Sequence, residues 1–300
     1  FDDQYRGCSH IMEEELEELN RTEFAKNRVY AQVWKFATAV WRSQGGHIPQ
    51  VPELRWEHAV AIMAYTLEMP SHNPMYKVFN AAVREAGRSR EEYLNNFHFK
   101  VLHFLLTKAR HALWDAQTRE CHCVSRGVQG IRFIAQRHQS VRFGQFTSTS
   151  FCDKAAQEFG IDTTFRVQTC YGVPIRDFSA IPTEEEVLIP PFEVFNVTKV
   201  THKGNRPIIH LRSKNTSSTY NCELAKGDVP GGRSLPTAGV QGLRGSPAPP
   251  ALPGKGGGLH HGEGEVGSSI SGNVLAHLPA ALTRGLQWGP WRHGTARHGT

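Results

Sequence analysis

The stretch Cys121-His122-Cys123-Val124-Ser125-Arg126-Gly127-Val128 marks the change of pattern that decides the fold class. Before it, apolar residues recur with a period of about 3.6, which is the period of an amphipathic helix. After it, apolar and polar residues alternate with a period of two, which is typical of strands. Helices followed by strands predict an α+β protein rather than a doubly wound sheet of alternating strands and helices.

The helical part is predicted to contain several amphipathic segments. They span residues 12–42, 58–67, 76–86 and 92–114, and a break at residues 20–22 can divide the first into two helices. Gly87 ends the third segment, and Ser89 with Glu92 forms a capping box for the fourth. The aromatic residues of the fourth segment are interpreted as core.

The second part is predicted to contain strands at residues 121–128, 141–150, 163–170, 186–200, 208–212 and 219–222. No Gly-x-Gly-x-x-Gly motif follows a strand, and no Walker loop is present. Neither a Rossmann dinucleotide site nor a P-loop is therefore expected.

Composition divides the 300-residue chain near Lys226. Residues 227–300 hold 18 of the 28 glycines and no cysteine, and they are predicted to form a disordered, dispensable tail. Residues 1–226 are predicted to form one domain, mainly helical over 1–117 and mainly β over 118–226.

The net charge is also divided unevenly. Seven basic and three acidic residues follow from Lys226 onward, which leaves 27 basic and 25 acidic residues in 1–225. That near-neutral balance gives no argument for a nucleic-acid partner.

The sequence also bears on the location of the protein. No run of about 18 apolar residues appears, so no transmembrane span is expected. The chain starts at Phe1 without a signal sequence, as a processed mature form would. The apolar stretch at residues 274–282 is too short for a glycolipid-anchor signal, so a soluble secreted form is expected.

Cysteines and glycosylation motifs favour the secretory pathway. The six cysteines are Cys8, Cys121, Cys123, Cys152, Cys170 and Cys222, and the three sequons begin at Asn20, Asn196 and Asn215. An even cysteine count together with three sequons favours disulfides, although six cysteines allow fifteen pairings. No metal site is expected, because zinc ligands come in paired short spacings and only Cys121 and Cys123 are close in sequence.

Polar residues interrupt three of the predicted strand regions. They are Arg126 between Ser125 and Gly127, the run Phe146-Thr147-Ser148-Thr149-Ser150, and Glu184-Glu185-Glu186 directly before Val187-Leu188-Ile189-Pro190-Pro191. Each has an ordinary structural interpretation: a strand arginine extends to solvent, a Ser/Thr run forms an edge strand, and a glutamate triplet forms a solvated turn.

Together, an Arg, a Ser-Thr-Ser and a Glu-x-Glu in that order resemble the Arg-Ser-Glu group of mono-ADP-ribosyltransferases. Further segments are similar to the arginine-specific vertebrate ecto-ADP-ribosyltransferases, from Phe1 to about Glu223. They are Phe1-Asp2-Asp3-Gln4-Tyr5, Ala64-Tyr65-Thr66, Phe79-Asn80, Phe143-Gly144-Gln145-Phe146, Thr169-Cys170, Glu184 to Pro191 and Ser218-Thr219-Tyr220-Asn221-Cys222.

The resemblance implies a helical N-terminal lobe packed on a split β-core, with NAD in the cleft between them. It also implies the disulfides Cys8–Cys222 and Cys121–Cys170, which leaves Cys123 and Cys152 either free or paired with each other. Ser125 departs from the family, which usually has an aromatic residue there, and Cys123 stands where a non-cysteine is usual. Both flank Arg126 and could weaken the affinity for NAD.

The side-chain chemistry suggests a role for each motif residue. The nicotinamide leaving group of NAD is already cationic, so its departure needs no general acid, but it creates an oxocarbenium-like centre. Glu186 can stabilise that centre, Ser148 can orient Glu186, and Arg126 offers a planar fork to the pyrophosphate or ribose.

Glu184 is expected to lie on the same side of an extended chain as Glu186 and to bind the acceptor guanidinium. In the family the first Glu of this pair marks arginine specificity. By resemblance alone, Tyr65, Gly127, Gln145 and Ser179 match further NAD-binding positions.

The sequence thus predicts a monomeric, secreted NAD–protein-arginine ADP-ribosyltransferase that takes NAD, or NADP, as substrate and needs no metal. Its expected partners are arginine-bearing proteins or small guanidino acceptors, not nucleic acid. Two alternatives stay open. One is an NAD glycohydrolase in which water replaces arginine, against which Glu184 argues. The other is a catalytically inactive secreted binding protein of the same fold.

Overall fold

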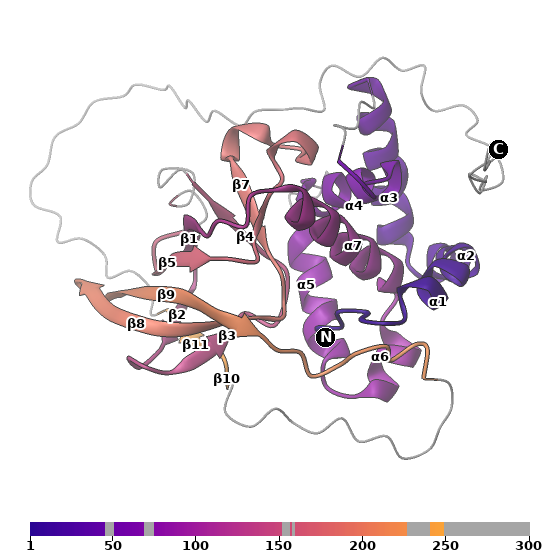
Figure 1. The fold of residues 1–300 in the computed structure, drawn as a ribbon. Coiled ribbons are helices and arrows are strands. Elements are labelled where there is room, and N and C mark those ends of the chain that lie inside the picture. The colour runs from indigo at the N-terminus through magenta and orange to yellow at the C-terminus, as the bar shows by residue number, and fades with distance from the viewer. Residues whose placement is uncertain (46–50, 69–74, 152–156, 158–159, 227–240, 249–300) are drawn as a thin grey trace, which may run out of the picture. The chain divides into compact units, whose positions relative to one another are not determined.

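A computed structural model of the chain describes residues 1–45, 51–68, 75–151, 157, 160–226 and 241–248. These residues belong to a compact unit, Phe1–Pro249. Helices precede strands along the chain, which confirms the α+β class (Figure 1). The helices are α1 (Ser9–Glu14), α2 (Leu16–Lys26), α3 (Arg28–Ser43), α4 (Trp56–Thr66), α5 (Met75–Ala86), α6 (Arg90–Asn96) and α7 (Lys100–Ala116). Within the described residues, no helix combines the length and the apolar character needed to cross a membrane.

The first helical segment is divided at other residues than the sequence predicted. Asn20 and its neighbours lie inside α2, whereas the breaks fall at Glu15 and Asn27. The side chain of Asn27 accepts a hydrogen bond from the backbone N–H of Tyr30 at 3.0 Å and so begins α3. An asparagine at the N-cap satisfies a backbone donor that the helix itself leaves unpaired.

The fourth predicted segment, residues 92–114, is also two helices. Ser89 accepts from the backbone N–H of Glu92 at 3.0 Å, as the capping box predicts, but the helix that it begins is α6. The carboxylate of buried Glu23 accepts from the backbone N–H groups of Lys100 and Val101, at 2.7 and 3.1 Å, and caps α7. This cap comes from α2, far away in sequence, so a local pattern could not reveal it.

The strands form a mixed sheet of order β10-β3-β8-β9-β5-β1-β4-β7-β6, and β11 pairs separately with β2. Two 3₁₀ turns, η1 (Arg176–Phe178) and η2 (Pro182–Glu184), precede β7. The strands are β1 (His122–Val128), β2 (Ile131–Ile134), β3 (Ser140–Arg142), β4 (Thr147–Ser150), β5 (Thr163–Thr169), β6 (Val173–Pro174), β7 (Glu186–Ile189), β8 (Glu193–Lys203), β9 (Arg206–Thr216), β10 (Gln241–Gly242) and β11 (Arg244–Pro247).

Three strand predictions need correction. Residues 141–150 are divided into β3 and β4, and residues 186–200 are divided into β7 and β8 around Pro190 and Pro191. Residues 219–222 form no strand. There the carboxylate of Asp2 accepts from the backbone N–H groups of Thr219 and Tyr220 at 2.9–3.0 Å, and Asp3 accepts from those of Cys222 and Glu223. Side-chain carboxylates thus replace the hydrogen bonds of a ladder.

Aromatic packing joins the helical part of the chain to the start of β4. The ring of Phe146, which is fully buried, contacts Tyr65 of α4, Phe79 of α5 and His103 of α7, with centroids 5.5–6.3 Å apart. On the other strands, Val124, Phe165, Val187, Phe195 and Leu211 belong to one buried cluster. Phe146 therefore fixes the position of the polar run that follows it.

The disulfides of the structure are Cys8–Cys222 and Cys121–Cys170, the two pairs that the resemblance implies. Cys123 is exposed and forms no disulfide with any described residue, while Cys152 lies outside the described residues. The first bridge joins Cys8, directly before α1, to the segment that Asp2 and Asp3 hold, so covalent and hydrogen-bonded links fasten the same two stretches.

The sequons differ in their surroundings. Asn20 is 6% exposed, and its side-chain oxygen accepts from the Tyr30 hydroxyl at 2.8 Å, so a glycan there does not fit the folded protein. Asn196 is half-buried in β8, where its oxygen accepts from the Ser140 hydroxyl at 3.2 Å. Asn215 is exposed near the end of β9. The structure thus disfavours Asn20 and favours Asn215 among the three candidates.

Part of the segment predicted to be disordered is ordered. Gln241 and Gly242 pair in parallel with β3, and residues 244–247 pair antiparallel with β2. The side chain of Leu243 packs against the buried β cluster. A Cβ at Gly245 would meet Ile131 Cγ2 at 2.4 Å, so only glycine allows this close approach. The rest of the predicted tail lies outside the described residues.

Candidate active site

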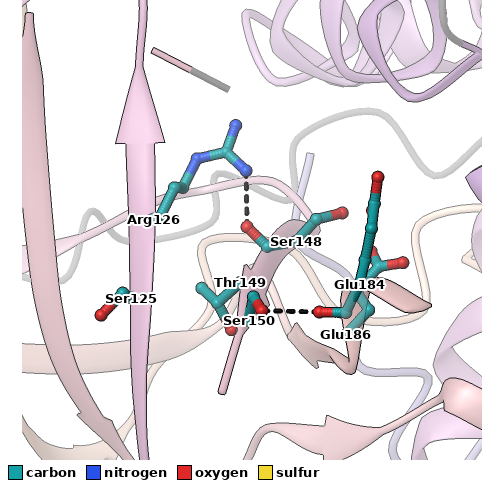
Figure 2. Close-up of a pocket in the computed structure, with 7 residues that line it drawn as sticks. All are labelled: Ser125, Arg126, Ser148, Thr149, Ser150, Glu184 and Glu186. Carbon is teal, nitrogen blue, oxygen red and sulfur yellow. Dashed lines mark hydrogen bonds between the residues drawn. The ribbon is translucent and has the colours of Figure 1, made fainter. Parts of the chain in front are cut away.

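The three polar segments meet at one pocket, which is lined by Ser125, Arg126, Ser148, Thr149, Ser150, Glu184 and Glu186 (Figure 2). Strand register explains the meeting. Ser125 of β1 lies opposite Ser150 of β4, and Ser150 in turn lies opposite Glu186 of β7. Residues 25 and 36 positions apart in sequence therefore become cross-strand neighbours.

Arg126 is held in place by β4. Its Nη1 donates a hydrogen bond to the carbonyl oxygen of Ser148 at 2.6 Å, and Figure 2 shows the guanidinium directed across the pocket toward that strand. A guanidinium is planar and carries five N–H donors, so this one hydrogen bond orients the group and leaves other donors available to a ligand. The arrangement suits a phosphate or ribose oxygen.

Glu186 is the first residue of β7 and is only 4% exposed. Burial raises the pKa of its carboxyl from 4.5 to about 7, and this effect outweighs the Ser148 hydroxyl, the charge of Arg126 and the Ser179 hydroxyl, which all lower it. The Ser179 hydroxyl donates to Oε2 at 3.5 Å. A carboxyl with a pKa near neutrality responds strongly to any positive charge brought beside it.

Glu184 reaches the pocket for a different reason than the sequence suggested. The chain is not extended here, because Glu184 ends η2 and Glu185 has a left-handed backbone, with φ 46° and ψ 51°. The hydroxyl of Ser150 donates to the Glu184 carbonyl at 2.5 Å and holds this turn. Glu184 and Glu186 both line the pocket, whereas Glu185 is exposed and forms an ion pair with Arg176 at 3.7 Å.

Tyr65 lies behind the pocket rather than on its surface. The side chain is fully buried, and its hydroxyl donates to the Phe146 carbonyl at 3.1 Å. Burial raises the pKa of Tyr65 to about 12, and a hydrogen bond with the Ser148 hydroxyl is the first effect that opposes the rise. Tyr65 is therefore not among the residues that line this pocket, and its role in binding NAD stays a prediction. Tyr65 instead contacts Ser148, the residue that contacts Glu186.

The other positions predicted by resemblance surround the pocket without lining it. Gly127 is buried in β1 opposite Thr164, and Gln145 accepts from Arg84 of α5 at 2.7 Å. Ser179 is buried and contacts Glu186, as described above. The structure thus joins Ser179 to the motif residues directly, while Gln145 is joined to the helical part.

The sequence analysis missed a residue beside the pocket. Tyr76 of α5 is half-buried, and burial raises its pKa. Next in order of effect on this pKa are the charges of Arg126, Glu184 and Glu186, and the ring centroid of Tyr76 lies 6.4 Å from that of Tyr65. Tyr76 stands four residues before Asn80 on the same helix face, and that spacing is the signal that could have found it.

Ser125, which replaces the usual aromatic residue, has its own partner. Its hydroxyl accepts from Arg166 Nη1 of β5 at 2.9 Å, and the side chain is 4% exposed. Among the described residues, no group of three or more His, Cys, Asp or Glu side chains could hold a metal ion.

A helical lobe joined to a sheet that gathers an arginine, a serine and two glutamates defines an ADP-ribosyltransferase of the Arg-Ser-Glu type. Residues 1–219 match the family described as NAD:arginine ADP-ribosyltransferase. The chain is 54% identical over 226 residues to the erythroblast NAD(P)(+)–arginine ADP-ribosyltransferase of chicken (Gallus gallus). The aligned residues cover 75% of this chain and 74% of that protein. The chain therefore belongs to the NAD:arginine ADP-ribosyltransferase family.

Two further comparisons agree. Identity is 48% over 240 residues to the human (Homo sapiens) GPI-linked NAD(P)(+)–arginine ADP-ribosyltransferase 1, covering 75% of this chain and 72% of that protein. The crystal structure of the eukaryotic mono-ADP-ribosyltransferase ART2.2 aligns with a TM-score of 0.64 at 38% identity, covering 74% of this chain and 94% of that one. This agreement confirms the α+β architecture of the ADP-ribosyltransferase fold.

Proposed function

We propose that the protein acts as an NAD(P)(+)–protein-arginine ADP-ribosyltransferase, with Arg126, Ser148, Glu184 and Glu186 as its site. The observation that carries the proposal is the pair of glutamates, from one turn, in the same pocket as Arg126 and Ser148. A mutant of ART2.2 has been solved in complex with NAD, and this chain aligns with it at a TM-score of 0.63 and 37% identity.

Glu186 acts on the donor. When the bond between the ribose C1′ and the nicotinamide nitrogen breaks, its electron pair leaves with neutral nicotinamide and positive charge develops on the ribose. An ionised carboxylate beside that charge stabilises the transition state. The nicotinamide of bound NAD is itself cationic, so it favours the ionised form of a carboxyl whose pKa is about 7 in the free protein.

Ser148, Tyr65 and Arg126 position these groups. The Ser148 side chain lowers the pKa of both Tyr65 and Glu186, so its hydroxyl is placed to orient the carboxylate of Glu186. Arg126 is fixed by the Ser148 carbonyl and offers its remaining donors to the pyrophosphate or ribose of NAD. Ser148 therefore takes part in both functions. Its backbone carbonyl fixes Arg126, which binds NAD, and its side chain orients Glu186, which stabilises the charge on the ribose.

Glu184 acts on the acceptor. The guanidinium of arginine is cationic and a weak nucleophile, so it needs both attraction to the site and removal of a proton. Glu184 is half-buried and lies at the rim of the pocket, where its carboxylate can bind the guanidinium. As the new bond to C1′ forms, the nitrogen loses a proton to this carboxylate.

The names of the relatives bear on location and partners. Several are GPI-linked or ecto enzymes, which supports an extracellular or cell-surface location for this chain. The acceptors would then be arginine-bearing proteins exposed outside the cell, and the enzyme would need no metal and no second subunit. An NAD glycohydrolase would use the same Glu186 chemistry with water as acceptor.

One assay tests the activity. The full chain is incubated with labelled NAD, with and without agmatine as a small guanidino acceptor. Labelled ADP-ribosyl-agmatine is the expected product, and NAD consumption should rise when agmatine is added. Free ADP-ribose alone in both reactions would assign the chain to the glycohydrolases, and no consumption of NAD would make it a binding protein.

A further inference from the structure

The hairpin of β8 and β9 carries an unusual concentration of positive charge. Residues 194–222 contain Lys199, Lys203, Arg206, Arg212 and Lys214 and no aspartate or glutamate. The domain as a whole is nearly neutral, so this stretch is balanced by acidic residues elsewhere. The charge is therefore a local property of one part of the sheet.

These five cations lie on one face, here called the hairpin face. Lys203 pairs with Arg206, Lys199 with His210, and Asn196 with Arg212, and residues directly opposite each other point to the same side of a sheet. Pro207, Ile209 and Leu211 alternate with the cations of β9 and are buried on the opposite side. Lys214 Nζ donates to the hydroxyl of Ser140, which lies opposite Asn196, and so joins the same face.

The cations are exposed and repel one another. Lys199, Lys203, Arg206, Arg212 and Lys214 are all exposed. Within the described part of the chain, none of them forms an ion pair. After burial, the charges of Lys199 and Arg166 are the main causes that lower the pKa of His210. Like charges across a sheet disfavour folding, so an anionic ligand would relieve this cost.

The shape and chemistry of the hairpin face select the kind of ligand. From Arg206 to Lys214 the strand extends for about 26 Å, which makes a long, narrow track of cations. Apart from Ile208 on β9, the paired positions of this face offer no large apolar side chain. A protein partner would need an apolar centre to its interface, and a single-stranded nucleic acid would need aromatic platforms for its bases.

We propose that the hairpin face binds a linear sulfated polysaccharide. The regularly repeated anionic groups of such a chain match the cations that are spaced along the two strands. Sulfated polysaccharides occur outside cells, and this part of the argument rests on the extracellular location in the proposed function. The acceptor guanidinium is itself cationic and would be repelled, so this face is not where acceptors dock. The surface is thus a tethering site, separate from the chemistry.

The hairpin face and the active-site pocket lie on the same sheet. Lys199, His210, Arg166 and Ser125 form one cross-strand row, and Ser125 lines the pocket. Three strand spacings separate the ends of this row, which is about 15 Å. A polysaccharide on the hairpin would therefore hold the pocket near the matrix or cell coat without covering it.

Binding of a heparin oligosaccharide of defined length, measured by calorimetry at several salt concentrations, tests the proposal. The test variant is Lys199→Gln with Lys203→Gln and Arg206→Gln. The control removes the same charge from exposed positions of α2 and α3, through Lys26→Gln, Arg28→Gln and Lys35→Gln. All proteins also carry Asn196→Gln and Asn215→Gln, so that no glycan near the hairpin enters the comparison.

The test variant should bind heparin on the order of tenfold more weakly and with a shallower salt dependence, because fewer counterions are released. The affinity of the control for heparin should stay within about twofold of the parent's affinity, because salt screens charges that are distant from the hairpin face. Both should keep the parent's melting temperature and agmatine modification. Equal loss in the two variants, or equal affinity of the parent for a DNA duplex of matched charge, would overturn the proposal.

Discussion

At the scale of single residues, the two glutamates of the pocket should separate into two functions. Glu186→Gln should lower both NAD cleavage and arginine transfer by about a hundredfold or more, since both reactions pass through the ribose cation. Glu184→Gln should lower transfer to agmatine by about a hundredfold while NAD cleavage to ADP-ribose continues. Product analysis by chromatography measures both rates.

Glu185→Gln is the matched control, because Glu185 is exposed and outside the pocket. It should be close to neutral in both reactions. Normal agmatine modification by Glu184→Gln would show that acceptor binding depends on another group.

The raised pKa of Glu186 makes a prediction about stability. The folded protein holds the proton of this carboxyl up to about pH 7, whereas the unfolded chain releases it near 4.5. Its contribution to stability is therefore full below 4.5 and is lost as pH rises through 7. The glutamine of Glu186→Gln cannot ionise. Between pH 4.5 and about pH 7, the free energy of unfolding of this variant should therefore rise relative to that of the parent by up to roughly 3 kcal/mol. Urea unfolding at pH 5 and pH 8 measures the difference, and a constant difference would contradict it.

Some of these residues could be predicted from sequence and others could not. Arg126, Ser148 and Glu186 stand out because charged or hydroxyl groups interrupt apolar strands, and such groups are costly to bury without a purpose. Tyr65 gives no such signal, since a buried tyrosine in a helix looks like core. The left-handed backbone of Glu185 was also invisible, because glutamate has no preference for that conformation.

At the scale of elements, the division between α6 and α7 depends on one distant carboxylate. Glu23 accepts from two backbone N–H groups at the start of α7, which a helix leaves unpaired. Glu23→Ala should therefore lower the free energy of unfolding by about 1–3 kcal/mol. Glu17→Ala, on an exposed position of the same helix, is the control and should be nearly neutral. Equal effects in urea denaturation would show that the cap contributes nothing.

The same element shows why helix boundaries were harder to predict than helix existence. Residues 92–114 keep an apolar face throughout, so local periodicity describes one helix. The chain nevertheless breaks between Asn96 and Lys100, because Glu23, from outside the segment, and the buried ring of Phe97, inside it, fix the turn. Ser89 was predictable, since its partner Glu92 is only three residues away.

At the scale of the whole molecule, several links join the start of the chain to the stretch that follows β9. Asp2, Asp3 and the Cys8–Cys222 bridge all act on the stretch that follows β9. The sequence could not assign these contacts from spacing, because six cysteines allow many pairings and the aspartates carry no local pattern. Only the family resemblance pointed to the bridge.

Residues beyond Lys226 pack on the domain. The composition predicts an end near Lys226, but Leu243 packs on the β cluster, Ala248 N donates to the Gly130 carbonyl at 2.9 Å, and Gly245 fits closely against Ile131. We propose that the folded domain extends to Ala248. Truncation after Ala248 should leave the melting temperature unchanged, whereas truncation after Lys226 should lower the free energy of unfolding by about 1–2 kcal/mol, because it removes an apolar contact. Gly245→Val in the full chain should reproduce part of that loss through the clash with Ile131. If both truncated proteins have the same melting temperature as the full chain, residues 241–248 are not part of the domain.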